Sequence, residues 1–266
     1  MKLESFFTSI ANKMRELLGT TDKIKPKNFV NKLTEIFNAG KKSAYDAFWD
    51  NYQQNGNRRD YYCAFSGKGW TTDNFKPKYD IIIDGSSDSN IYFFDRNLVS
   101  GSLKQILKNQ GVELKLQNLG NAYKVVRLFY NNSGITELPT IDFSSITTGS
   151  LSSYTISWLS GLQTVEKFIF PNSSSVTLTL FGHCSKLTNI VFEGTCLNSF
   201  NFDTNGAVSA DSIKNLFEHL DTTATTTNRT ITLNKKTKTA YTQVYNDWDT
   251  KVAYYSTNGN WTFSIV

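Results

Sequence analysis

The sequence predicts an α+β chain in which a helical hairpin precedes a short, irregular β-solenoid closed by an α/β cap. Three observations predict it: amphipathic helix patterns near the N-terminus, apolar residues that recur every 25–27 residues in the middle, and mixed helix and strand patterns near the C-terminus. The 266 residues are enough to bury a core, and an aromatic content of 14% argues against disorder.

Residues 1–40 have the pattern of two amphipathic helices. Gly19 is a natural stop for the first helix, and Pro26 a natural start for the second. A hairpin of this size is too small to be stable alone, so we expect its apolar side to attach the chain to other proteins or to a second copy. The candidate docking and oligomerisation residues are Phe6, Phe7, Ile10, Met14, Leu17, Phe29, Leu33 and Ile36.

The charge of the chain is concentrated in this hairpin. Residues 1–42 hold 9 basic and 4 acidic side chains, whereas the remaining residues hold 19 of each. Because the lysines alternate with the apolar stripe, we interpret them as a solvated helix face, and nucleic acid is not an expected partner.

Residues 41–110 are dense in aromatic side chains and are expected to cover the N-terminal end of the repeats. Two interpretations remain open for them. They form a packed sub-core, or they form a platform on which a sugar can stack, with Tyr61, Tyr62 and Trp70 as the candidate ligand contacts.

Residues 111–206 contain the repeats. Ile135, Leu138, Ile141 and Phe143 have the same offsets as Leu162, Val165, Phe168 and Phe170, and a third, shorter copy follows in Leu187, Ile190 and Phe192. A period of 25–27 residues is typical of leucine-rich repeats, in which each short strand is buried by its neighbours. We therefore predict a parallel stack with a neutral outer strand face rich in Ser, Thr and Asn.

Residues 207–266 are predicted to be a C-terminal cap. Ser209 is a plausible N-cap for a helix that carries Ile213 and Leu216. A strand is expected at 230–233, a helix at about 237–252 and a final strand at 260–266.

No motif predicts catalysis, a metal or another cofactor. Of the three cysteines, Cys63, Cys184 and Cys196, only Cys184 has a histidine beside it, which is too little for a metal site. Carboxylate pairs such as Asp46 with Asp50 are interpreted as solvated helix residues, so we expect a protein that is not an enzyme.

Two stretches are similar to known families. The pattern Phe181-x-x-Cys184-x-x-Leu187-x-x-Ile190 resembles the BspA-type leucine-rich repeat. The block from Tyr45 to Asp80 (YDAFWD-x-YQ-x-NG, then DY, AF, G-x-GW and F-x-P-x-YD) and the ending 260–264 resemble tail and fibre-like proteins of phages and prophages of Firmicutes. The resemblance implies a virion protein without agreed catalytic residues.

The resemblance also accounts for the absent export signal. Glu4 stands where the apolar core of a signal peptide would begin, and no apolar run approaches the roughly 20 residues of a membrane span. We therefore expect a virion protein made in the host bacterial cytoplasm, without membrane insertion and as a homo-oligomer.

The expected function is that of a tail or fibre protein. Residues 1–40 would contact other virion proteins, and the repeats would bind a glycan or protein of the host surface. Two alternatives remain open: a capsid-attached head fibre or decoration protein, and a polysaccharide depolymerase.

Overall fold

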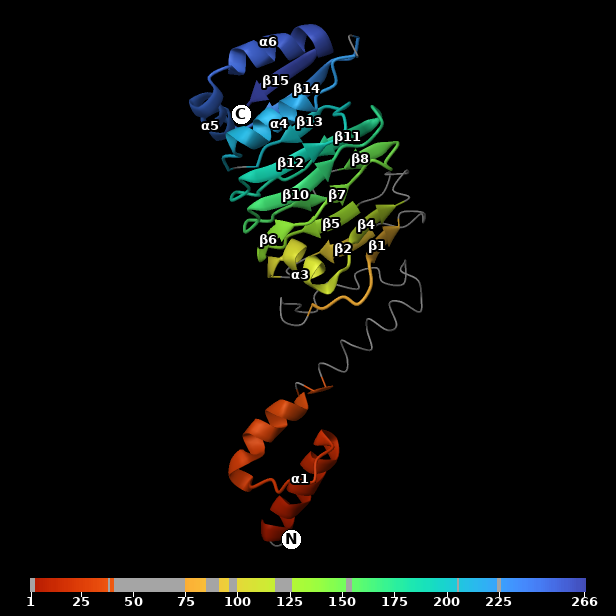
Figure 1. Ribbon diagram of the computed structural model, residues 1–266, viewed down its shortest axis with the longest axis vertical. Coiled ribbons are helices and arrows are strands. Elements are labelled where there is room, and N and C mark those ends of the chain that lie inside the picture. The colour runs from red at the N-terminus through yellow and green to blue at the C-terminus, as the bar shows by residue number, and fades with distance from the viewer. Residues whose placement is uncertain are drawn as a thin grey trace. The chain divides into compact units, whose positions relative to one another are not determined.

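The computed structural model describes residues 3–37, 39–40, 75–84, 91–95, 100–117, 126–151, 155–204, 206–223 and 226–266. The chain divides into two compact units, residues 1–54 and residues 55–266. The described part of the first unit is helical, and that of the second combines helices with parallel sheets (Figure 1). The mixture of helices and strands that the sequence predicts is thus confirmed.

The first unit contains the predicted helices. Helix α1 (Leu3–Leu18) ends at Gly19, whose φ of +60° suits a residue without a Cβ. A 3-10 turn, η1 (Pro26–Asn28), leads into a helix over 29–37. The two helices pack through a small core made of Ala11, Met14 and Ile24, with Ile10, Leu18, Phe29 and Ile36 around it.

The candidate docking residues divide into two groups in this unit. Met14 is buried in the small core, and Phe7, Ile10, Phe29 and Ile36 are half-buried. Phe6, Leu17 and Leu33 are exposed, together with Val30 and Phe37, which the sequence analysis did not select. Val30, Leu33 and Phe37 lie three and four residues apart and therefore share one helix face.

The second unit contains fifteen described strands, and every pairing between them is parallel. Their bounds are β1 Ile81–Asp84, β2 Ile91–Asp95, β3 Gly101–Ser102, β4 Leu114–Gln117, β5 Val126–Tyr130, β6 Ile135–Leu138, β7 Ile141–Asp142, β8 Gly149–Leu151, β9 Ile156–Ser157, β10 Thr164–Ile169, β11 Val176–Thr179, β12 Asn189–Glu193, β13 Phe200–Phe202, β14 Arg229–Leu233 and β15 Trp261–Ile265.

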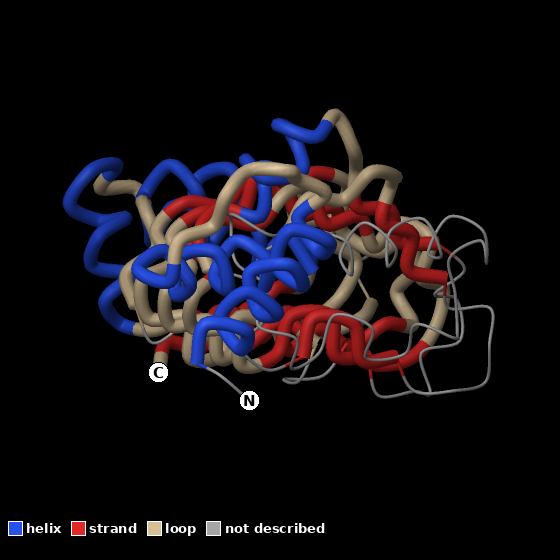
Figure 2. Tube along the Cα trace, turned by 90° about the horizontal axis from the view of Figure 1, so that it is seen from below, coloured by secondary structure: helices blue, strands red, loops and turns tan. Residues whose placement is uncertain are grey.

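These strands form four sheets. Sheet 1 pairs β1 with β4, and sheet 2 has the order β2-β5-β9. Sheet 3 has the order β12-β10-β6-β3, with β7 also on β10, and sheet 4 has the order β15-β14-β13-β11-β8. Along the chain, β8, β9 and β10 belong to sheets 4, 2 and 3, so these three consecutive strands add one strand to each of the three sheets. Figure 2 views the second unit along this stack.

The predicted repeat residues lie in register in sheet 3. Val165 pairs with Leu138 on one side and with Ile190 on the other, so the sequence offsets of 27 and 25 residues are strand pairings. All three side chains are buried. Parallel pairing also continues outside 111–206, from β1 to β15.

A column of phenylalanine rings fills the space between the sheets. Phe168 lies at its centre, with ring centroids 5.6 Å from Phe143, 5.7 Å from Phe181 and 6.0 Å from both Phe192 and Phe200. Each of these rings is fully buried. Phe168 and Phe192 come from sheet 3 and Phe200 from sheet 4, so the two sheets bury these rings against one another.

Helices cover the C-terminal end of the stack (Figure 1). Helix α4 (Ala210–Glu218) begins at Ser209, whose hydroxyl accepts a hydrogen bond from the Ser212 amide, as the sequence predicts. Its side chains complete the edge of sheet 3: Ser212 Oγ accepts from the Ile190 amide (3.0 Å) and Asn215 Oδ1 from the Phe192 amide (2.6 Å). These two backbone amides at the edge of sheet 3 thereby gain the hydrogen-bond acceptors that a further strand would have supplied.

The single helix predicted over about 237–252 is wrong. Two helices, α5 (Lys235–Tyr245) and α6 (Trp248–Gly259), occupy this region, because Asn246 adopts the left-handed conformation (φ +50°) and ends the first one. Both pack around Phe217 of α4, whose ring centroid lies 5.5 Å from that of Tyr241 and 5.6 Å from that of Trp248.

A buried ion pair joins this cap to the last strands. Arg229 Nη1 donates to Asp221 Oδ2 at 2.6 Å, and the guanidinium lies 4.3 Å from the centroid of the Trp261 ring. The Asp221 carbonyl accepts from Trp261 Nε1 at 2.7 Å. Burial alone would raise the pKa of Asp221, but hydrogen bonds from Thr223 and Arg229, with the Arg229 charge, outweigh it and lower the pKa to about 2.

Candidate functional site

The outward face of sheet 4 is the candidate binding surface. Side chains alternate along its strands, so the apolar residues point into the core and the intervening ones point outward. Every outward residue at these positions is a neutral Ser, Thr or Asn: Ser150, Thr177, Thr179, Ser199, Asn201, Thr230, Thr232, Thr262 and Ser264. We call these nine residues the hydroxyl face.

The strand register arranges the hydroxyl face in rows. Asn201 pairs with Thr179 on one side and with Thr232 on the other, and Thr232 pairs with Ser264, which gives one continuous row. The second row contains the pairs Ser150 with Thr177 and Thr230 with Thr262. Strands lie about 4.8 Å apart, and alternate residues of a strand about 6.7 Å apart, so the face is a regular grid of polar groups.

Hydrogen bonds within the sheet order part of this grid. Ser199 Oγ, just before β13, accepts from the Thr230 amide of β14 at 3.0 Å. Asn260 Nδ2 donates to Asn228 Oδ1 at 2.7 Å, just before strands β15 and β14 begin. Because a hydroxyl both donates and accepts, and an amide side chain offers both groups, the face can match many neutral polar ligands. It presents no charge that would select an ion.

Sheet 3 presents a different outer surface. Its outward residues include Glu166 and Lys167 of β10 and Glu193 of β12. Lys167 Nζ lies 2.6 Å from Glu193 Oε1, and Lys104 Nζ lies 3.3 Å from Glu166 Oε1. The two large sheets of the second unit therefore differ in chemistry, one charged and one neutral.

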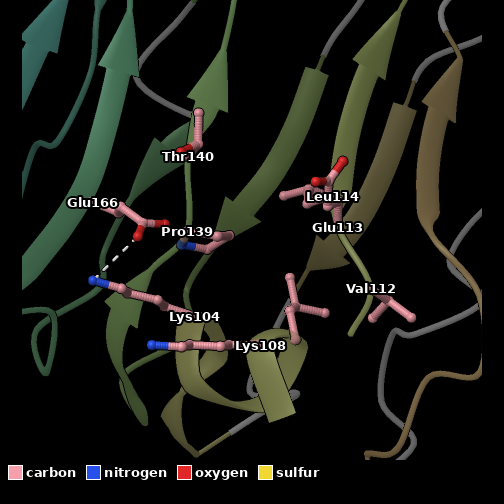
Figure 3. A pocket seen from close by; sticks show the side chains of 9 residues that line it. Lys104, Lys108, Val112, Glu113, Leu114, Pro139, Thr140 and Glu166 are labelled. Atoms are coloured by element: carbon pink, nitrogen blue, oxygen red, sulfur yellow. Dashed lines mark ion pairs between the residues drawn. The ribbon is translucent and has the colours of Figure 1, made fainter. Parts of the chain in front are cut away.

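A pocket of about 400 Å³ adjoins sheet 3 beside helix α3 (Leu103–Gln110). Leu107, Val112 and Leu114 give it apolar lining, and Lys104 and Lys108 add positive charge. Figure 3 places Glu113 and Glu166 on opposite sides of the pocket, with Glu166 paired to Lys104. The lining offers binding groups of both signs.

The described thiols are not poised for chemistry. Cys184 and Cys196 are buried, and burial raises the pKa of each to about 12, so both are protonated at neutral pH. Among the described residues no group of three His, Cys, Asp or Glu side chains could hold a metal ion. Nor does that part of the chain contain a helix long and apolar enough to cross a membrane.

Comparisons with protein-family models, with curated proteins and with solved structures found no match to this chain. What the chain can bind must therefore be inferred from its own surfaces.

The sequence-predicted ligand contacts Tyr61, Tyr62 and Trp70 lie outside the described residues. The structure instead brings together residues that sequence reasoning named only as a Ser-, Thr- and Asn-rich strand face. The signal was present in the alternation of Thr177 with Thr179 and of Thr230 with Thr232, where a hydroxyl residue stands on each side of one apolar residue. Without the register, nothing assigned these pairs to one sheet.

Proposed function

We propose that this chain is a structural protein of a bacteriophage virion, of the tail or fibre type, which binds the surface of the host cell. In this proposal the stacked turns form an irregular leucine-rich-repeat solenoid. The hydroxyl face is the adhesive surface, and residues 1–40 attach the chain to other virion proteins or to further copies. The ligand on the cell would be a glycan or a protein.

The observation that carries the proposal is the hydroxyl face itself. A rigid parallel sheet holds nine neutral side chains at fixed spacing, so binding would require little ordering of the protein. Neutral hydroxyl and amide groups complement ligands that are themselves rich in hydroxyl and amide groups, as glycans are. A surface of this kind suits adhesion by many weak contacts.

The exposed apolar residues of the first unit support the attachment role. Phe6, Leu17, Val30, Leu33 and Phe37 are exposed, and exposed apolar patches mark sites of protein association. The two alternatives from the sequence, a capsid-attached head fibre or decoration protein and a polysaccharide depolymerase, remain separate outcomes of the tests that follow.

A particle experiment tests the virion role. Cryo-EM of purified particles should locate the chain at the tail, whereas a capsid location would favour the head fibre. Deleting residues 1–40 should remove the chain from particles while the truncated protein keeps the circular dichroism signal of the repeats. Particles that incorporate the truncated chain normally would contradict the attachment role. The release of reducing ends from host wall polysaccharide would favour the depolymerase.

A further inference from the structure

Two exposed aromatic rings form a stacked pair at one corner of the repeats. Trp158 follows β9 directly and is 47% exposed, and His183 is exposed in the turn between β11 and β12. Their ring centroids are 3.9 Å apart and the planes are inclined by 27°. The two residues lie at the same place in successive turns, and the Trp158 amide donates to the Gly182 carbonyl at 2.9 Å.

The backbone at both residues is unusual. Trp158 has a φ of +59° and His183 a φ of +60°, which is the left-handed region that side chains with a Cβ avoid. Asn131, at the same place one turn earlier, has a φ of +57°, and asparagine tolerates this conformation. Three successive turns thus have a left-handed residue at this place, and in one of them that residue is tryptophan.

The tryptophan contributes little to the core, because nearly half of its side chain faces solvent. A large aromatic residue held exposed in a disfavoured conformation is the kind of outlier from which a binding role is inferred. His183 stacks on the indole and fixes its orientation, so Trp158 presents a pre-oriented aromatic surface to solvent.

We propose that Trp158 is a stacking platform for a sugar ring of a neutral oligosaccharide of equatorially substituted pyranose units, with His183 as its support. Pyranose rings whose hydroxyl groups are equatorial carry axial C–H groups on each face, and these faces pack on an indole. The residues from 157 to 163 carry no charge, and exposed Lys186 is the one lysine, arginine or carboxylate residue among 181–187, so the surroundings of the two rings are mostly neutral. Exposed Ser160 and Ser185 flank the two rings in sequence and can bond ring hydroxyls. Trp158 follows β9 of sheet 2 and is not part of the hydroxyl face of sheet 4, so it would be a second contact for the surface ligand. The inference rests on the proposed function, since it names the class of that ligand.

Titration of the full chain with cellohexaose and with N-acetylchitohexaose, followed by NMR or calorimetry, tests the proposal. The unsubstituted chain should bind at least one of them, and Trp158→Asn should weaken that binding about tenfold or more. Asparagine fits the left-handed backbone, so this variant should keep its melting temperature within a few degrees. Tyr254→Asn is the matched control, because it removes another exposed aromatic ring (53%) on α6. This variant should bind the sugar as tightly as the unsubstituted chain does.

His183→Ala should weaken binding several-fold, because the indole loses its support. Equal affinities for a folded Trp158→Asn variant and the unsubstituted chain would overturn the proposal, and so would the absence of binding to both sugars at millimolar concentration. A protein ligand would instead appear as cell binding that depends on Trp158 but is not competed by either sugar, and this result also rejects the proposal. Failure of the proposed function is a separate result, since the chain would then not bind intact host cells at all.

Discussion

Of the described ion pairs, Arg229 with Asp221 is the most deeply buried. Its contribution to stability depends on the hydrogen bonds that each group makes as well as on the attraction between the two charges. Removing a charge from water is costly, so the pair is favourable only because each group has several partners. Asp221 accepts from Arg229 and from Thr223, whose hydroxyl lies 2.7 Å away. Loss of either charge leaves the other one buried and unpaired.

The lowered pKa of Asp221 gives a testable pH dependence. The folded value is about 2, whereas an unfolded aspartate titrates near 4, so the carboxylate stabilises the fold above about pH 4. This contribution, about 2–3 kcal/mol, should disappear as the pH falls from about 4 to 2. Urea unfolding at several pH values measures it.

Asp221→Asn provides the comparison. It should lose about 3 kcal/mol of unfolding free energy at pH 7, because Arg229 remains charged, and its stability should fall less steeply in acid. The double variant Asp221→Asn with Arg229→Gln should recover part of that loss. An Asp221→Asn variant with unchanged stability and the same acid slope would show that the pair does not act in this way.

At the scale of elements, close packing of one turn on the next determines which residues the turns accept. A Cβ added to Gly161 would lie 2.2 Å from the Ser133 carbonyl oxygen, and one added to Gly206 would lie 2.3 Å from that of Ser185. In both cases the obstacle is backbone of an earlier turn, which cannot move aside as a side chain can.

Gly161→Ala should therefore lower the unfolding free energy by about 1–3 kcal/mol, since the turns must separate to admit the methyl group. Thermal unfolding should show a melting temperature about 2–12 °C lower. Gly182→Ala is the matched control, because no atom lies within 4 Å of its added Cβ, and it should melt at or slightly above the parent temperature. Equal behaviour of the two variants would contradict the close stacking of turns.

Part of this architecture could be predicted from the sequence. Strands at Ile135, Val165 and Ile190 follow from apolar residues at fixed offsets, and the α4 helix follows from its cap and period. Strand β2 was not predicted, since its run Ile-Tyr-Phe-Phe-Asp lacks alternation. The break at Asn246 was missed because a single asparagine within an otherwise helical pattern is only a weak stop signal, although asparagine tolerates the left-handed conformation that ends α5.

The candidate sites, too, could be predicted from the sequence only in part. The neutral strand face was predicted as a composition, but its rows depend on register, which composition does not contain. Trp158 and His183 were not selected, although each precedes its repeat leucine, Leu162 or Leu187, by four residues. That shared offset was the available signal, because parallel pairing brings residues at the same offset of successive turns into contact.

At the scale of the whole molecule, the second unit presents two large sheets of unlike chemistry. Sheet 3 carries paired charges, such as Lys167 with Glu193, whereas the hydroxyl face of sheet 4 carries none. If adhesion depends on the neutral face, the same substitution should act differently on the two sheets. The chain offers a matched pair of sites, because each sheet has an outward Asn paired with an outward Thr on a neighbouring strand.

The test compares two double variants of the full chain by flow cytometry of fluorescently labelled protein on intact host cells. Asn201→Lys with Thr232→Lys alters the hydroxyl face, and Asn189→Lys with Thr164→Lys alters sheet 3. We expect the first variant to lose cell binding about tenfold or more, because two ammonium groups block a neutral surface, and the second to bind like the parent chain. Unimpaired binding by the first variant, or a loss confined to the second, would contradict adhesion through sheet 4.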